Sequence, residues 1–352
     1  MPKEDTKTYR GSVKFQLILL FIFGSLCTFM LHRTTKVISI NDQFPPIIAL
    51  NTKKIMRLGG DPTTVTAGMY IRDFSTFDIF HNKFIASLTV WFKFDPNKIS
   101  LNKIGNFFIS NARLLYKDKP YTKVVNDQLF AKYNIAIEFT TSLNYKNFPL
   151  DDHTINIILT NSSFSPNEIM FKIARNNLII DPEIDPIGWD FVDKKVETGY
   201  VETNLDPLDK KIKSYAPRII ASLYFKRSGL RKLITIFIPL LLIFYIALMT
   251  LTLNPFTEFG RIIGVSISSV SAVLAYRFII GRLSPQTGYL MISDKIFMII
   301  LIACCAIFFI NLFCKKITGF YKNLSAVLLH TYVIFTLLYI IYPTIAFSYE
   351  VY

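Results

Sequence analysis

The sequence predicts an extracellular antiparallel β-sandwich followed by a four-helix transmembrane bundle. Of its 352 residues, 51% are hydrophobic and only 18% are charged, whereas soluble proteins carry about 25% charged residues. Long apolar runs fill the last third of the chain, and between residues 32 and 226 apolar and polar residues alternate with a period of two. These patterns exclude an ordinary soluble protein and a disordered chain.

Four apolar blocks in the second half of the chain are long enough to cross a membrane. A spanning helix needs about 20 mostly apolar residues, and the blocks are Leu233–Leu253, Ile262–Ile280, Ile296–Phe313 and Ala326–Phe347. The loop between the last two blocks holds Lys315, Lys316 and Lys322. Because cytoplasmic loops carry an excess of lysine and arginine, we expect this loop inside. Counting back through the spans places the residues before Leu233 outside.

A further apolar run lies near the N-terminus. Phe15–Leu31 follows four basic residues, Lys3, Lys7, Arg10 and Lys14, which is the pattern of a signal peptide or signal anchor. The run lacks a small-residue cleavage pattern, so retention is favoured over cleavage. We expect a signal segment at 1–31, an outer domain at 32–232 and a helical domain at 233–352. Such a multi-pass protein would lie in the plasma membrane, or in the inner membrane if the source is bacterial.

The outer domain shows the alternation of half-buried strands. It occurs in Phe84–Asp95, Tyr133–Phe139, Ile155–Leu159 and Ile219–Arg227. Strands of this kind with short Asn, Asp and Pro breaks favour an antiparallel β-sandwich. Trp91 falls on the polar face of its strand. It either packs against a neighbouring strand or loop, or makes a ligand or subunit contact, because Trp is favoured at such interfaces.

The second apolar block is the candidate pore helix, because it holds far more small polar residues than the other three. At 3.6 residues per turn, one stripe of this helix is formed by Gly264, Ser268, Ser271, Ala275 and Phe278. We expect this stripe to face water. Two alternatives stay open: the small residues serve close helix packing, or a register that starts at Arg261 places Val270 and Leu274 in the pore.

Charged residues near both ends of this block bear on ion selectivity. Glu258 and Arg261 lie at the expected inner end, and Arg277 and Arg282 lie at the outer end. Basic rings favour anions, although cation selectivity stays open. Arg277 lies within the apolar block, where an ionised side chain is costly and is often functional or paired. Snorkelling to the outer interface is the favoured interpretation.

Other classes of function have little support in the sequence. The four histidines do not cluster with acidic residues at metal-ligand spacing, and there is no Gly-rich phosphate loop or nucleophile elbow. We therefore expect no enzyme, no metal and no cofactor. The net charge of +14 arises from cations between the apolar blocks, so topology explains it better than a nucleic-acid partner.

Three spaced motifs carry a resemblance to a known family. Asn147–His153 reads Asn-Phe-Pro-Leu-Asp-Asp-His between two predicted strands, Arg227 precedes Pro239 of the first apolar block, and Pro285–Tyr289 follows the second block. In this order they resemble the signature turn, the first membrane helix and the loop between the second and third helices of pentameric ligand-gated ion channels, the Cys-loop receptor family. Thr141 and Ile155 stand where animal members have loop cysteines, a departure that fits the bacterial branch.

The resemblance implies a homopentamer in which an agonist bound between outer domains opens a pore. It assigns six aromatic residues to the agonist site: Trp91, Phe107, Phe108, Phe164, Tyr200 and Tyr215. An aromatic cage suits an amine through cation–π attraction, and protons are the other candidate agonist. The resemblance also assigns gating contacts to Asp151, Arg227, Pro285 and Tyr289, with Asp151 and Arg227 as an ion pair.

The function expected from these features is that of a ligand-gated ion channel. Its partners would be a small-molecule agonist or protons, permeant small ions and membrane lipid. The alternative is a non-conducting membrane sensor or signalling receptor, although the loop between the third and fourth blocks is too short for an output domain.

Overall fold

The computed structural model describes residues 42–49, 61–204, 213–228, 231–314 and 319–346, together with single positions between 14 and 29. The expected signal segment, 1–31, therefore lies almost wholly outside the described residues. The chain divides into two compact units. One contains residues 41–144 and 152–228, and the other contains 1–40, 145–151 and 229–352. The short segment 145–151 thus belongs with the helices and not with the strands that flank it.

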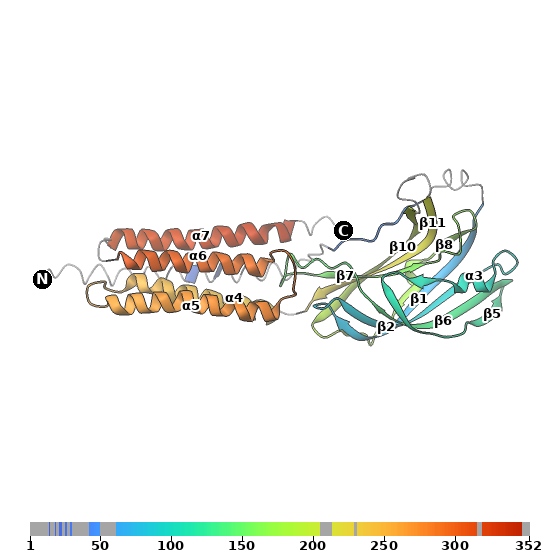
Figure 1. The fold of residues 1–352 in the computed structure, drawn as a ribbon, viewed down its shortest axis with the longest axis horizontal. Coiled ribbons are helices and arrows are strands. Elements are labelled where there is room, and N and C mark those ends of the chain that lie inside the picture. Colours follow the sequence, from blue (N-terminus) through green and yellow to red (C-terminus); the bar gives the residue numbers. More distant parts are fainter. Residues whose placement is uncertain are drawn as a thin grey trace. The chain divides into compact units, whose positions relative to one another are not determined.

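The first unit consists of two β-sheets, as the alternation predicts. The seven-stranded sheet has the order β4-β6-β2-β1-β8, with β5 beside β6 and β9 beside β1, and the four-stranded sheet has the order β10-β11-β7-β3 (Figure 1). All pairs are antiparallel except those of β1 with β8 and with β9. The strands are β1 Thr63–Asp78, β2 Lys83–Phe94, β3 Phe108–Ile109, β4 Ala112–Lys117, β5 Tyr121–Val125, β6 Gln128–Phe139, β7 His153–Thr160, β8 Ile169–Lys172, β9 Leu178–Ile180, β10 Trp189–Asn204 and β11 Lys213–Arg227.

Aromatic residues form much of the core between the sheets. Phe84 of β2 is fully buried, and its ring lies 5.4 Å from that of Phe77 on β1. The Phe77 ring in turn lies 4.9 Å from that of Phe225 on β11, edge to face. Such pairs add about 0.5 to 1.5 kcal/mol beyond the area that they bury. The apolar face predicted for β2 is therefore the face that holds the two sheets together.

Trp91, on the opposite face of β2, packs against neighbouring strands. Gly68 of β1 is its register partner, and a Cβ atom added to Gly68 would lie 2.2 Å from Trp91 Cε2. On the other side, the ring of Phe130 on β6 lies 5.7 Å away. Within one chain the indole thus covers the bare backbone of Gly68. This is the packing interpretation of Trp91, and a ligand contact stays a prediction.

Replacement of Gly68 by alanine should destabilise the sandwich because the new methyl group has no room beneath Trp91. We expect a loss of about 1 to 3 kcal/mol, the usual range for overpacking. Thermal unfolding in detergent, followed by tryptophan emission, measures it. In a Trp91→Leu background the same change should cost much less. An equal cost in both backgrounds would contradict the proposed contact.

From residue 231 onwards, the described residues of the second unit form four long helices that lie side by side (Figure 1). They are α4 Arg231–Met249, α5 Phe259–Leu283, α6 Ile292–Leu312 and α7 Gly319–Ala346, and the short helix η2, Thr250–Thr252, extends α4. Among the described residues, three segments are long and apolar enough to cross a membrane: Arg231–Thr252, α5 and α6. The apolar stretch of α7, Asn323–Tyr339, is shorter.

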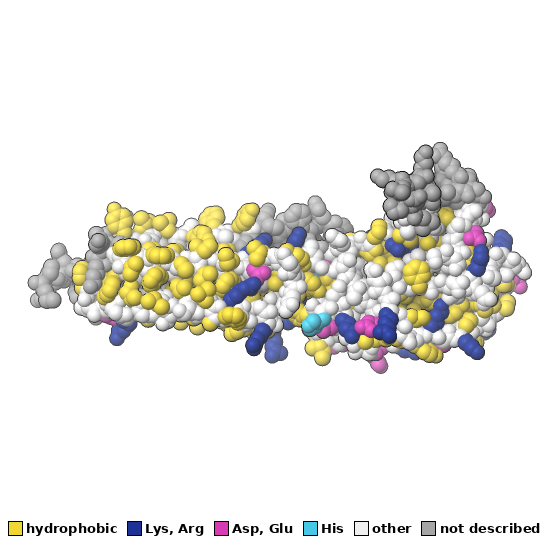
Figure 2. Space-filling model, viewed as in Figure 1, with side chains coloured by type: hydrophobic (Ala, Val, Ile, Leu, Met, Phe, Trp, Pro, Cys, Tyr) yellow, Lys and Arg dark blue, Asp and Glu magenta, His cyan; other side chains and the backbone are white. Residues whose placement is uncertain are grey.

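The surface of the helical unit is that of a membrane protein. Hydrophobic side chains are dense over its visible face, where only a few charged side chains appear, whereas lysines, arginines and acidic residues are spread over the visible face of the strand unit (Figure 2). Large apolar side chains such as Leu242 of α4 and Phe309 of α6 are more than half exposed, at 59% each. A soluble monomer rarely exposes so continuous an apolar surface. The predicted order of a β-sandwich followed by apolar helices is confirmed, and a complete four-span bundle is not.

Candidate functional site

Helix α5 has one packed face and one exposed face. The packed face consists of Ile262, Ser266, Ser269, Val273 and Ile280, which are buried. The five predicted stripe residues, Gly264, Ser268, Ser271, Ala275 and Phe278, are all exposed within the chain. Of the alternative register, Leu274 is also exposed, at 50%, whereas Val270 is half-buried. Both registers of the predicted pore stripe therefore stay open.

Two serines of α5 have the packing role that was the alternative interpretation. Ser266 Oγ donates a hydrogen bond to Ile262 O at 2.7 Å, and Ser269 Oγ donates to Val265 O at 2.9 Å. Both side chains thereby satisfy their hydroxyl groups within their own helix. Ser266 and Ser269 thus lie on the packed face of α5, whereas Ser268 and Ser271 lie on its exposed face.

A buried amide links α5 to the two neighbouring helices. Asn311 of α6 donates through Nδ2 to Thr250 Oγ1 at 2.6 Å and to Ser266 Oγ at 2.8 Å. All three residues are at most 2% exposed. A side-chain hydrogen bond between membrane helices is worth about 0.6 kcal/mol on average and up to about 2 kcal/mol. This cluster therefore fixes the packed face of α5 against its scaffold.

Arg277 forms an ion pair with Asp294 of α6. Its guanidinium donates to Oδ1 of Asp294 in α6, whose side chain is only 6% exposed. Asp294 Oδ2 accepts the Met291 N–H at 3.0 Å, so the carboxylate also caps α6. The pairing of Arg277 is thus confirmed, and snorkelling towards the outer interface stays a prediction. Helical periodicity alone does not reveal this partner, because α6 brings Asp294 close to Arg277 only in the folded chain.

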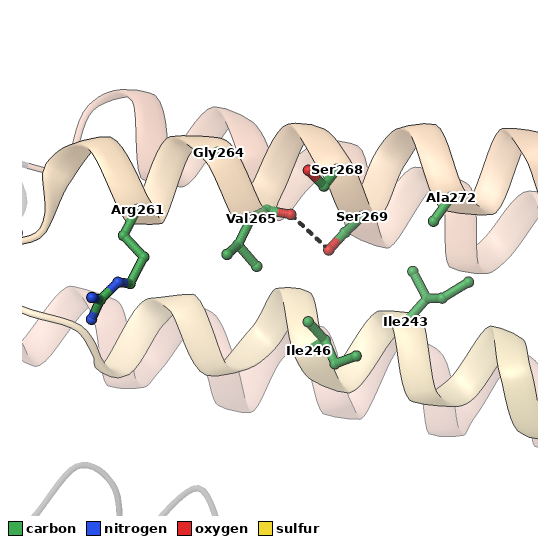
Figure 3. A pocket seen from close by; sticks show the side chains of 8 residues that line it. All are labelled: Ile243, Ile246, Arg261, Gly264, Val265, Ser268, Ser269 and Ala272. Atoms are coloured by element: carbon green, nitrogen blue, oxygen red, sulfur yellow. Dashed lines mark hydrogen bonds between the residues drawn. The ribbon is translucent and has the colours of Figure 1, made fainter.

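A cavity of about 490 Å³ lies between α4 and α5 beside the exposed stripe. In Figure 3, Ile243 and Ile246 of α4 face small residues of α5, with Arg261 at one end. Arg261 is 72% exposed and pairs with Glu258 at 2.7 Å. The cavity is lined by Ile243, Ile246, Arg261, Gly264, Val265, Ser268, Ser269 and Ala272. Gly264 and Ser268 of the predicted stripe thus border an open hollow, not a packed contact.

The segment 145–151 provides backbone partners for the start of α6. The first N–H groups of a helix have no partner within the helix. Here Ile292 N donates to Lys146 O at 3.0 Å and Ser293 N donates to Phe148 O at 3.1 Å. The Phe148–Pro149 peptide bond within the segment is cis. The predicted signature turn is therefore part of the N-terminal cap of α6.

The same segment contacts the loop between α5 and α6. Tyr145 N donates to the hydroxyl of Tyr289 at 2.9 Å, and Lys146 Nζ lies 6.0 Å from the centre of the Tyr289 ring. Pro285, at the other end of this loop, is buried. The structure therefore brings the predicted gating residue Tyr289 together with the two residues that immediately precede the signature turn.

Asp151 and Arg227 belong to different units. Asp151 is 1% exposed. Within its own unit Arg227 lies over the ring of Trp189, at 4.3 Å from its centre, and its N–H donates to Asp152 Oδ1 at 3.0 Å. The ion pair expected from the resemblance stays a prediction.

The six aromatic candidates differ in exposure. Phe107, Phe164 and Tyr200 are buried at 6%, 5% and 2%, whereas Phe108 is 47% exposed. Trp91 and Tyr215 are half-buried. Among the described residues, no ring contact joins any two of the six. The aromatic agonist site therefore stays a prediction.

Two of these rings each have the ammonium group of a lysine from the same chain lying over them. Lys117 Nζ lies 3.9 Å from the centre of the Phe107 ring, and burial lowers the pKa of Lys117. Lys103 Nζ lies 5.3 Å from the centre of the Phe164 ring and 2.8 Å from Glu168 Oε1. Both rings therefore already make a cation–π contact, and the cation in each case is a lysine of the same chain.

The two tyrosines are held by hydrogen bonds. The Tyr200 hydroxyl donates to Ile169 O at 2.9 Å, and burial raises the pKa of Tyr200 to about 12. The Tyr215 hydroxyl donates to Glu202 at 2.9 Å, and this bond raises the pKa of Tyr215. Tyr200 is therefore a core residue, and Tyr215, with Phe108, is left as a surface candidate.

Comparison with known proteins does not assign the chain to a family: no protein-family model matches it, and no curated protein does so either. Over the described ranges, no group of three or more His, Cys, Asp or Glu side chains could hold a metal ion.

The Lys103–Glu168 pair gives a pH-dependent prediction. The hydrogen bond from Lys103 and a second from Ser165 N–H lower the pKa of Glu168. Its stabilisation is therefore present above the ordinary pKa of glutamate, about 4.3, and is lost as the pH falls through the lowered pKa. Glu168→Gln should reduce stability near neutral pH by at most about 1 kcal/mol, since the pair is partly exposed.

The check is thermal unfolding in detergent near pH 7 and near pH 3. The difference between the wild type and Glu168→Gln should be smaller near pH 3 than near pH 7, because the stabilisation is lost as the carboxylate is protonated. Glu183→Gln, at an exposed glutamate, is the matched control. A difference that grows as the pH falls would contradict the account.

Proposed function

We propose that the protein is a ligand-gated ion channel similar to the pentameric Cys-loop receptor family, with α5 as its pore helix. The observation that carries this proposal is the exposed small, polar stripe on a helix that is long and apolar enough to cross a membrane. Lipid offers no hydrogen bonds to serine hydroxyls, whereas a water-filled conduit does. One chain supplies one lining helix, so several copies are needed, and the resemblance implies five.

The contacts around α6 support a route for gating. The α5–α6 loop contains Tyr289, which accepts a hydrogen bond from Tyr145, and α6 begins against the carbonyl groups of Lys146 and Phe148. A displacement of segment 145–151 would therefore act directly on the end of α5. With the outer domain outside the cell, this segment would be the element that carries agonist binding to the pore.

The agonist site would be completed by a neighbouring subunit. Phe108, Trp91 and Tyr215 retain exposed surface within one chain, and Glu202 beside Tyr215 adds a negative charge. An amine suits such a set, because aromatic rings and a carboxylate both attract a cation. Phe107, Phe164 and Tyr200 would support this site from the core.

Selectivity would depend on which charges remain available to ions. Arg261 pairs with Glu258 and Arg277 pairs with Asp294. Two of the three arginines near the ends of α5 are thus partly neutralised within the chain. The basic character of the pore is therefore weaker than the sequence alone predicts, and both ion types are kept as candidates.

Reconstitution into planar bilayers tests this function. Short primary alkylamines and steps to acidic pH should evoke current from the purified protein. Ser271→Glu would add one carboxylate per subunit to the pore and should shift the reversal potential in a salt gradient towards that of the cation. Thr122→Glu, at an exposed position of β5, should leave it unchanged. A protein that is monomeric in detergent and electrically silent would refute the proposal, and a silent oligomer would favour a non-conducting sensor.

A further inference from the structure

The segment Asp42–Ala49, here called the strap, begins at a buried carboxylate. Asp42 accepts three hydrogen bonds: from Asn144 N at 2.6 Å, from Thr154 N at 2.6 Å and from His153 Nδ1 at 3.1 Å. The side chains of Asp42 and His153 are 1% and 0% exposed. A buried carboxylate is stable only when it is fully hydrogen-bonded, and three N–H groups converge on this one.

The two backbone donors flank one segment of the chain. Asn144 immediately precedes segment 145–151, and Thr154 follows it closely. Asn144 N binds Oδ1 and Thr154 N binds Oδ2 of the same carboxylate. Asp42 therefore closes the base of the signature turn without a covalent link.

The far end of the strap lies against β10 and β11. Ile48 N donates to Tyr200 O at 2.8 Å and Tyr200 N donates to Ile48 O at 3.0 Å. Arg218 donates to Pro46 O at 3.1 Å. A Cβ atom on Gly199 would lie 2.7 Å from Ile48 O, so the strap requires a glycine at this position.

The strap therefore joins two places that are distant in sequence. One end holds the amides on both sides of segment 145–151, which contacts α6 and Tyr289. The other end pairs with β10 next to Glu202 and opposite the strand that holds Tyr215. Both ends are fixed by hydrogen bonds to backbone groups. Because the strap has only the few residues between Asp42 and Ile48, a displacement of one end should be transmitted to the other.

We propose that Asp42 is a positioning residue of the gating apparatus: its carboxylate fixes the base of the signature turn, and the strap couples that turn to the β10–β11 hairpin. The coupling rests on the proposed channel function. The fixation of the turn does not, so the two can be tested separately.

Hydrogen exchange of the full-length protein in detergent tests the fixation. In Asp42→Asn one carboxylate oxygen becomes an amide nitrogen that cannot accept a hydrogen bond. The Asn144 and Thr154 amides should then exchange at least about tenfold faster, as expected when a charge-assisted hydrogen bond is lost. Asp127→Asn, in the exposed β5–β6 turn, should change neither. If Asp42→Asn does not fold, His153→Phe removes a single donor while it keeps a planar ring, and it should give a smaller effect in the same direction.

Gly199→Ala tests the coupling from the other end of the strap. It should also speed exchange at Asn144 and Thr154, although it touches neither residue. In bilayers, butylamine serves as the probe, and Asp42→Asn and Gly199→Ala should each change the butylamine concentration that gives half-maximal current by about threefold or more. If the two sites are coupled, the change in the double variant should differ from the product of the two single changes.

Each outcome decides one part of the proposal. Unchanged exchange at both amides in a folded Asp42→Asn protein overturns the fixation. Unchanged exchange in Gly199→Ala, or multiplicative effects on current, overturns the coupling. If the wild type gives no current, the channel function fails, and the exchange results still decide whether Asp42 and the strap hold the turn.

Discussion

A helix in a bilayer must satisfy every polar group that it carries, because the hydrocarbon core supplies no hydrogen bonds. Helix α5 meets this constraint differently on its two faces. Ser266 and Ser269 bond to carbonyl oxygens of their own helix, and Asn311 ties Ser266 to the neighbouring helices. Ser268 and Ser271 stand on the face that the chain leaves uncovered. The need for water on that face is the reason for proposing an assembly with a pore.

A second consequence follows for the ends of the membrane helices. Helix α6 begins with N–H groups that its own turns cannot bond, and segment 145–151 supplies carbonyl oxygens to two of them. Asp294 contributes to the same cap while it holds Arg277 of α5. Hydrogen bonds thus join segment 145–151, the start of α6 and Arg277 of α5, and this connection is the basis of the proposed gating route.

Local periodicity predicted much of this structure. The period of two located β2, β6, β7 and β11, and the stripe predicted with a period of 3.6 lies on the exposed face of α5. Contacts between distant segments were not predictable in this way. Nothing near Arg277 in the sequence identifies Asp294 as its partner, and nothing near Phe107 and Phe164 identifies Lys117 and Lys103. Asn311 could have been noticed as a lone amide in an apolar block, whereas Asp42 lies in an ordinary polar stretch.

Water access to the exposed face of α5 tests the central claim most directly. In a background without Cys27, Cys304, Cys305 and Cys314, a charged thiol reagent can be applied to Ser271→Cys and to Leu242→Cys in reconstituted vesicles. Both positions are exposed within the chain, but only a thiol in contact with water ionises and reacts. The account predicts rapid modification of Ser271→Cys and none of Leu242→Cys. An unreactive Ser271→Cys, or equal reactivity at both positions, would contradict it.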